Sequence, residues 1–377
     1  MFNNRNALFA LVLLACGAAC SARAAACGIP VFRYALERWS AEAYQVVVFH
    51  RGELDPSELE IVGALKQAAS ENGGDSNFTL RVADLDSVID EATRAQWRAQ
   101  ESNQVPRVVI AYPAPSPMQG IVWSGPLSQA TVKAITTSPL RKEVARYLQD
   151  GETGVWVLLE SGDVEKDTAA ARLLEAELAK MPDQLTFPDF SSEPLWTGSS
   201  LELKISFPLI RLSRTDPDEA VFRAMLLGSE EDLKRQHAAE PLAFLLFGRA
   251  RTLYALVGRG INKENVKKAC EFLVGPCACV IKADNPGVDM LVSASWDAAL
   301  ETPLVREIVL PPLTSVSAQA SESETPIEGT VAPTAPQSAP AEARSHRLLW
   351  GILIALGLIV VAVAVLSVVT WKRSSVK

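Results

Sequence analysis

The spacing of apolar and polar residues predicts an α/β chain whose elements come in two similar sets. In the first set, residues 44–50 form a short apolar run rich in β-branched side chains, which is typical of a buried strand, and 54–70 carries apolar residues at near-helical spacing. The set continues with a strand at 78–85, a helix at 87–100, strands at 105–112 and 120–125, and a helix at 129–149.

The second set repeats this order around a loop-like insertion. We expect a strand at 153–160, a helix at 164–181, a loop at 182–200, a strand at 201–212, a helix at 216–236, strands at 242–247 and 252–257, and a helix at 262–273. In each set a proline, Pro106 or Pro241, stands at the start of the third strand.

The order strand, helix, strand, helix, two strands, helix resembles the thioredoxin-like fold, and Val105-Pro106 falls where that family places its cis-proline. The resemblance implies an α/β fold of two tandem thioredoxin-like domains, 44–150 and 151–313, the second with an insertion. Pro106 and Pro241 are then markers of the fold. A generic doubly wound α/β pair is the main rival.

The most informative part of this comparison is a motif of the family that the sequence lacks. Catalytic members place Cys-x-x-Cys in the loop between the first strand and the first helix, because the helix N-terminus lowers the thiol pKa. Here that loop reads Phe-His-Arg-Gly-Glu at 49–53 and Glu-Ser-Gly-Asp at 160–163. Without cysteines neither loop supports dithiol exchange, so the resemblance implies noncatalytic modules for binding and spacing, with no catalytic residue.

One other use of the first loop is anion binding. His50 and Arg51 lie just before a predicted helix N-terminus, where free N–H groups and the helix dipole favour a carboxylate or phosphate. The alternative is a solvated His-Arg pair in an ordinary turn.

Cysteines supply the remaining candidate chemistry. Cys27, Cys270, Cys277 and Cys279 follow the predicted signal segment, and an even number suits two disulfides in an oxidising compartment. We expect Cys270 to pair with Cys277 or Cys279, while Cys27 binds the remaining partner or stays free. The alternative is that Cys277 and Cys279 form a strained redox disulfide or bind a soft metal such as Cu(I). No His or Met flanks them closely enough to complete a metal site.

Both ends of the chain predict export and membrane anchoring. Residues 1–24 combine Arg5, a short apolar core and the small-x-small motif ending at Ala24, as in a cleavable signal peptide. The alternative is a lipoprotein signal in which Cys16 becomes lipidated. Residues 347–371 form a predicted transmembrane helix, because 348–370 is uncharged and longer than the roughly twenty residues that span a bilayer.

The segments beside this helix fit the same arrangement. Residues 314–346 are rich in Pro, Ala and Ser and are predicted to form a disordered stalk, and 372–377 a basic cytoplasmic tail. The aromatic-rich segment 25–43 is expected to pack on the first domain as a lid or an extra strand. A net charge of -8, spread along the ectodomain, argues against a nucleic-acid partner.

Together these features favour a binding protein over an enzyme. The leading hypothesis is a single-pass, membrane-tethered scaffold protein with its ectodomain in the periplasm or outside the cell. It would need no cofactor or metal, and its partner would be a protein, such as the transporter of which it is an accessory subunit. The alternative is a thiol-redox or soft-metal-handling protein that uses Cys277 and Cys279.

Overall fold

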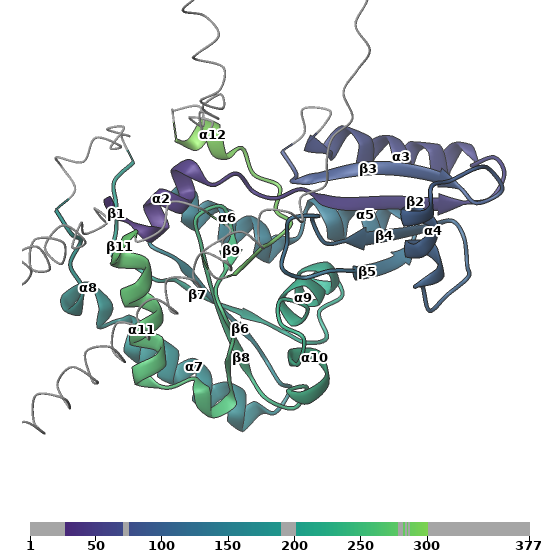
Figure 1. The fold of residues 1–377 in the computed structure, drawn as a ribbon. Coiled ribbons are helices and arrows are strands. Elements are labelled where there is room, and N and C mark those ends of the chain that lie inside the picture. The colour runs from purple at the N-terminus through teal and green to yellow at the C-terminus, as the bar shows by residue number, and fades with distance from the viewer. Residues whose placement is uncertain are drawn as a thin grey trace, which may run out of the picture. The chain divides into compact units, whose positions relative to one another are not determined.

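The computed structural model describes residues 27–70, 75–189, 201–277, 282, 285 and 287–300, and it confirms an α/β fold with two mixed sheets (Figure 1). The first half contains β1 (Cys27–Pro30), α2 (Val31–Arg38), β2 (Tyr44–His50), α3 (Pro56–Ala68), β3 (Phe78–Asp84), α4 (Glu91–Arg98), β4 (Arg107–Ala111), β5 (Ile121–Pro126), α5 (Gln129–Thr136) and α6 (Pro139–Gln149). The second half contains β6 (Val155–Leu159), α7 (Val164–Leu178), α8 (Met181–Gln184), β7 (Leu209–Leu212), α9 (Ala220–Leu227), α10 (Leu233–Gln236), β8 (Leu242–Phe247), β9 (Arg251–Thr252), β10 (Leu256–Val257), α11 (Lys263–Val274), β11 (Pro276–Cys277), β12 (Val288–Asp289) and α12 (Trp296–Ala299).

The first sheet has the strand order β3-β2-β4-β5. Strand β2 pairs with β3 in parallel and with β4 antiparallel, and β4 pairs antiparallel with β5. Successive side chains of a strand point to opposite faces. Val46 and Val48 therefore join the core under α3 and α5, whereas Val47 and Phe49 pack with Trp97 of α4. Both faces of β2 are covered.

The second sheet repeats this pattern of pairing. Strand β6 pairs in parallel with β7 and antiparallel with β8, and β8 pairs antiparallel with both β9 and β10. Strand β12 extends the sheet beyond β9. Each sheet thus has a central strand, β2 or β6, with a parallel neighbour on one side and an antiparallel neighbour on the other.

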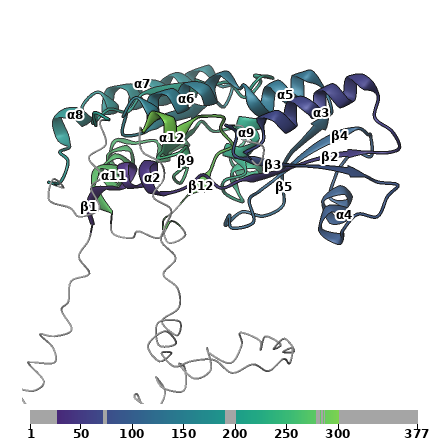
Figure 2. The same cartoon turned by 90° about the horizontal axis from the view of Figure 1, so that it is seen from above.

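One hydrophobic core joins the two halves. Val46 and Val48 of β2 belong to the same buried cluster as Val155 and Val157 of β6, and Phe222 of α9 lies in that cluster too. Helix α9 contacts both β5 and α5. Figure 2 shows α3, α5, α6 and α7 along one side of the two sheets and α4 on the other side of the first sheet. The halves therefore form parts of one compact unit.

The N-terminal segment packs on the second half, so the prediction that it covers the first domain was wrong. Val31, Phe32 and Trp39 belong to the cluster formed by the outer face of the second sheet with α7 and α11. The amide of Val31 donates to the carbonyl oxygen of Gly275 at 3.0 Å, and α2 lies beside α11 and β11 (Figure 1). The physical reason is that helices of the first half already cover both faces of the first sheet.

Most predicted elements are present, with shifts at their ends. The helix predicted at 216–236 and the strand predicted at 252–257 are each divided into two shorter elements. The strands at 44–50 and 242–247 are confirmed with the predicted bounds. The helix predicted at 129–149 is two helices, because Ser138 caps a new helix that starts at Pro139. The strand predicted at 201–212 is confined to Leu209–Leu212, directly after Pro208.

The prolines differ in their peptide bonds. The peptide bond between Val105 and Pro106 is cis, whereas the bond before Pro241, the residue that directly precedes β8, is not. The predicted signal peptide, stalk, membrane helix and tail lie outside the described residues. Within 27–300, the helices that the structure describes are too short or too polar to cross a bilayer.

Candidate functional site

The loop after β2 is held by its own side chains. His50 Nδ1 lies 2.8 Å from the carbonyl oxygen of Gly52, a glycine with φ of +62°. Arg51 donates to Asp86 Oδ1 at 2.6 Å, and both side chains are about half exposed. Of the predicted anion-binding pair His50 and Arg51, the guanidinium of Arg51 is therefore already paired with the carboxylate of Asp86.

The helix end behind this loop is also occupied. The side chain of Asp55 accepts from the amide of Glu58 at 2.8 Å, and the side chain of Glu58 accepts from the amide of Asp55 at 2.8 Å. These reciprocal bonds form a capping box, and Pro56 has no N–H to offer. Hydrogen bonds from Ser57 and Glu58 lower the pKa of Asp55. An incoming anion would meet two carboxylates here, which weighs against an anion site.

The loop after β6 is closed in a similar way by a buried carboxylate. Asp167 accepts from the amide of Ser161 at 2.7 Å, from its hydroxyl at 2.8 Å, and from the amide of Gly162 at 2.9 Å. Asp163 caps α7 by accepting from the amides of Glu165 and Lys166. The amide groups that hold an anion at an open helix N-terminus thus bind the protein's own side chains.

An arginine fills the edge of the second sheet where the loops after β6 and before β8 meet. Arg214 Nε donates to the carbonyl oxygen of Glu160 at 2.8 Å, and its Nη2 donates to that of Glu240 at 2.9 Å, next to Pro241. Burial lowers the pKa of Arg214. In α/β sheets ligands often bind at the carboxyl ends of parallel strands. Here the guanidinium occupies that place, a role the sequence pattern did not reveal.

Cys270 is a free thiol, which corrects its predicted pairing with Cys277 or Cys279. Its side chain lies on the inner face of α11 together with Val266 and Leu273, in the core of the second half. Burial raises the pKa of Cys270 to about 12, so the reactive thiolate is suppressed at neutral pH. The helix turns this residue inward, away from β11, which holds Cys277.

The other predicted cysteines are only partly described. The backbones of Cys27 and Cys277 lie in β1 and β11. Cys279 lies outside the described residues. In the described part of the chain, no group of three His, Cys, Asp or Glu side chains is arranged to hold a metal ion.

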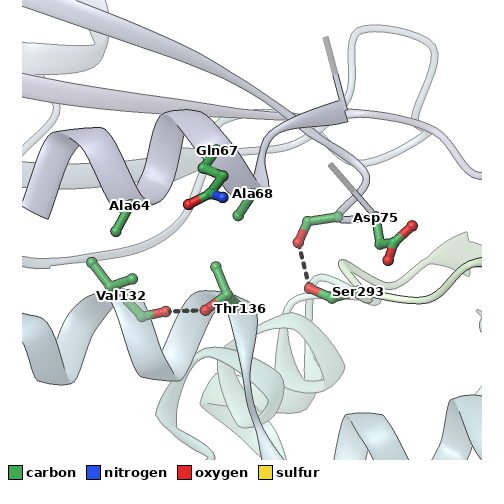
Figure 3. Close-up of a pocket in the computed structure, with 8 residues that line it drawn as sticks. Ala64, Gln67, Ala68, Asp75, Val132, Thr136 and Ser293 are labelled. Atoms are coloured by element: carbon green, nitrogen blue, oxygen red, sulfur yellow. Dashed lines mark hydrogen bonds between the residues drawn. The ribbon is translucent and has the colours of Figure 1, made fainter. Parts of the chain in front are cut away.

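A cavity of about 410 Å³ opens between α3 and α5 (Figure 3). Figure 3 shows Gln67 of α3 facing Thr136 of α5, with Ser293 at one end. The hydroxyls of Ser76 and Ser293 are hydrogen-bonded to each other, and Thr136 donates to the carbonyl oxygen of Val132 at 2.9 Å. The full lining comprises Ala64, Gln67, Ala68, Asp75, Ser76, Val132, Thr136 and Ser293.

A second cavity of about 560 Å³ shares Asp75 and Ser76 with the first. Arg249 and Asp297 line it and form an ion pair at 2.6 Å, with the guanidinium buried and the carboxylate half exposed. The remaining lining is Ser40, Ala41, Ser70, Asn77, Ala294, Ser295, Trp296 and Ala298. Such hydrogen-bonding groups suit a polar ligand or a peptide segment. Sequence analysis missed both cavities because their walls come from segments far apart in the chain.

Comparison with known proteins adds no relative. No family model, no curated protein and no solved structure matches this chain. Its function is therefore inferred from the chemistry of its own residues.

Proposed function

We propose that this chain is a membrane-tethered, extracytoplasmic binding or scaffold protein built from two noncatalytic thioredoxin-like halves. The observation that carries the proposal is the state of the two strand-to-helix loops. Each loop lacks cysteine. Asp55 and Glu58 form the capping box of α3. Asp163 caps α7, and Asp167 accepts from the amides of the loop before it. Loops closed in this way suit a structural role better than thiol chemistry.

The pairing of the strands supports the thioredoxin-like assignment. In both sheets the central strand, β2 or β6, has as its parallel neighbour the next strand along the chain, and as its antiparallel neighbour the strand after that. Helices separate these strands: α3 and α4 in the first half, and α7 with α8 and α9 with α10 in the second. This is the pairing expected from the order strand, helix, strand, helix, two strands. The resemblance therefore rests on topology as well as on element order.

The shared core and the two cavities support a binding role. A core that spans both halves holds their surfaces in a fixed relation. The cavities present amide groups from Gln67 and Asn77 and a carboxylate from Asp75. Ser76 and Ser293 add hydroxyl groups. A partner segment bound there would be held by hydrogen bonds.

Location and partner follow from the two ends of the chain. A signal at 1–24 and an apolar span at 347–371 would place the folded part outside the cytoplasm, on a Pro-rich stalk at 314–346. A tethered binding protein of this kind suits an accessory subunit of a membrane complex such as a transporter. Protease added to intact cells should remove the folded part, and a protected folded part would contradict the outward orientation.

Reductase activity distinguishes this function from thiol-redox chemistry. We expect the full chain, purified in mild detergent, to leave the disulfides of insulin unreduced in the presence of a dithiol reductant at concentrations where a thioredoxin is active. Activity that disappears in Cys279→Ser and persists in Cys270→Ser would overturn the proposal in favour of redox chemistry at Cys277 and Cys279.

Partner capture tests the binding role directly. Crosslinking in intact cells, followed by purification in mild detergent, should recover a specific membrane protein with the wild-type chain. Ala64→Trp should reduce that recovery at least several-fold, because the indole fills the cavity between α3 and α5. Leu59→Trp changes a residue that is 56% exposed and is turned away from Ala64 around the same helix, so it serves as the matched control. Equal recovery with both variants would place the partner elsewhere.

A further inference from the structure

The N-terminal strand brings two cysteines from opposite ends of the folded chain to one position. Strands β1 and β11 pair antiparallel, and Cys27 stands opposite Cys277 in their register. We propose that Cys27 and Cys277 form a disulfide that fastens the N-terminal segment to the end of α11.

The backbone geometry of such a pair suits a disulfide. Directly opposite residues of an antiparallel pair have Cα atoms about 4.5–5.5 Å apart and project their Cβ atoms to the same face. Disulfides span Cα separations of about 4.4–6.8 Å. The position of Cys27 opposite Cys277 therefore allows the bond without a large movement of either strand.

Contacts next to both cysteines hold the two strands in place. Pro30 pairs with Pro276, with a register shift between this pair and the cysteine pair. The amide of Val31 donates to the carbonyl oxygen of Gly275 at 3.0 Å. Phe32 is fully buried in the core of the second half. The segment that carries Cys27 is thus anchored beside Cys277 by packing that does not depend on the disulfide.

The other described cysteine cannot compete for Cys277. Cys270 lies in the helix core as a free, buried thiol. The pairing with Cys27 joins residues far apart in sequence, so the bond would close a very long loop. Such a crosslink restricts the unfolded chain strongly.

Formation of this disulfide needs an oxidant, and the proposed export would bring the chain into an oxidising compartment. Each thiol loses one proton, and the two sulfurs together give up two electrons as the S–S bond forms. A thiol-disulfide oxidant accepts them by exchange, and its own disulfide becomes two thiols. This step rests on the proposed extracytoplasmic location, because cytosolic thiols stay reduced.

Peptide mapping of the full chain tests the pairing. The purified, reduced protein in mild detergent is oxidised with oxidised glutathione, its free thiols are alkylated, and it is digested without reductant. Mass spectrometry should identify a peptide pair joined through Cys27 and Cys277. Linkage of Cys279 to either cysteine, or alkylation of both Cys27 and Cys277, would overturn the proposal.

Variants make the assignment specific. Cys279→Ser should retain the Cys27–Cys277 link. The double variant Cys27→Ser with Cys279→Ser should leave Cys277 either alkylated or joined to glutathione, with no link to another cysteine of the chain. Loss of the link in Cys279→Ser alone would contradict the proposal. The pairing of Cys27 with Cys277 is measured on purified protein. A folded part that stays protected from protease on intact cells would therefore contradict the outward location and leave the result on the pairing unchanged.

Discussion

The buried carboxylate of Glu219 accepts a hydrogen bond from the hydroxyl of Ser138, although the two residues belong to different halves of the chain. The same carboxylate accepts from the amide of Leu140 at 2.8 Å, so it caps α6 from outside that helix. Glu219 is only 1% exposed. A charge buried between the halves, with its partners supplied by the other half, links their folding.

Removing this carboxylate should destabilise the whole unit. Glu219→Ala leaves the hydroxyl of Ser138 and the amide of Leu140 without their acceptor, which we expect to cost about 3 kcal/mol. Urea unfolding of the full chain in mild detergent, followed by tryptophan fluorescence, measures this loss. Glu219→Gln, which keeps one acceptor, should cost less. Asp218→Asn changes an exposed neighbour and should have little effect, and an equal loss there would contradict the assignment to Glu219.

A second link between the halves predicts a coupled pair of substitutions. Tyr112 donates from its hydroxyl to the carbonyl oxygen of Gly228 at 2.5 Å. A Cβ at Gly228 would lie 2.2 Å from that hydroxyl oxygen. Gly228→Ala should therefore cost about 1–3 kcal/mol through overpacking. In a double-mutant cycle, Tyr112→Phe should recover part of this loss, and strictly additive free energies of unfolding would exclude the clash.

The loop after β6 should depend on its buried acid. Asp167→Ala removes the acceptor of three hydrogen bonds from Ser161 and Gly162, and we expect a loss of about 2–3 kcal/mol. Asp163→Ala removes only the exposed cap of α7 and should cost about 1 kcal/mol. Thermal unfolding monitored by circular dichroism compares the two. A larger loss for Asp163→Ala would show that the cap, rather than Asp167, holds the loop.

Cys270 predicts a pH dependence of stability. Burial raises its pKa to about 12 in the folded chain, whereas an unfolded cysteine titrates near about 8.5. Its contribution to stability is therefore complete below about pH 8.5 and declines as the pH rises toward 12, because only the unfolded thiol ionises easily. The decline should be smaller in Cys270→Ala, as measured by urea unfolding between pH 8 and pH 10.

The same burial should protect the thiol from modification. At pH 8 N-ethylmaleimide should leave Cys270 unmodified in the native protein and label it fully in urea, as peptide mass spectrometry can measure. Rapid labelling of Cys270 in the native protein would contradict its burial.

Several strands and helices could be predicted from the pattern of apolar and polar residues, because that pattern is a property of neighbouring residues. The strands β2 and β8 have the predicted bounds. Both are short, mostly apolar runs; Arg51 follows the first, and Pro241 and Gly248 flank the second. Helix ends were less predictable. Ser138 and Pro139 restart a helix inside what the apolar spacing presents as one, and only the last four residues of 201–212 pair as a strand.

The candidate sites depended on contacts that no local pattern contains. The positions of His50 and Arg51 before α3 were predicted, but the partner of Arg51 is Asp86. Arg214 bonds to Glu160 from 54 residues away. The first cavity combines α3, α5 and Ser293, and the second combines residues 40–41, Arg249 and residues 294–298. These contacts exist only once the halves have packed.

The sequence alone determined the α/β alternation, the repeated element order and the absence of cysteine from both strand-to-helix loops. These properties depend on residue identity and on spacing within a few turns of chain. Tertiary structure decided that the halves share one core, that the N-terminal segment packs on the second half, and that Cys270 is buried while Cys27 stands opposite Cys277. Burial and pairing are set by which distant surfaces exclude water together, and the order of residues along a strand or helix does not specify that choice.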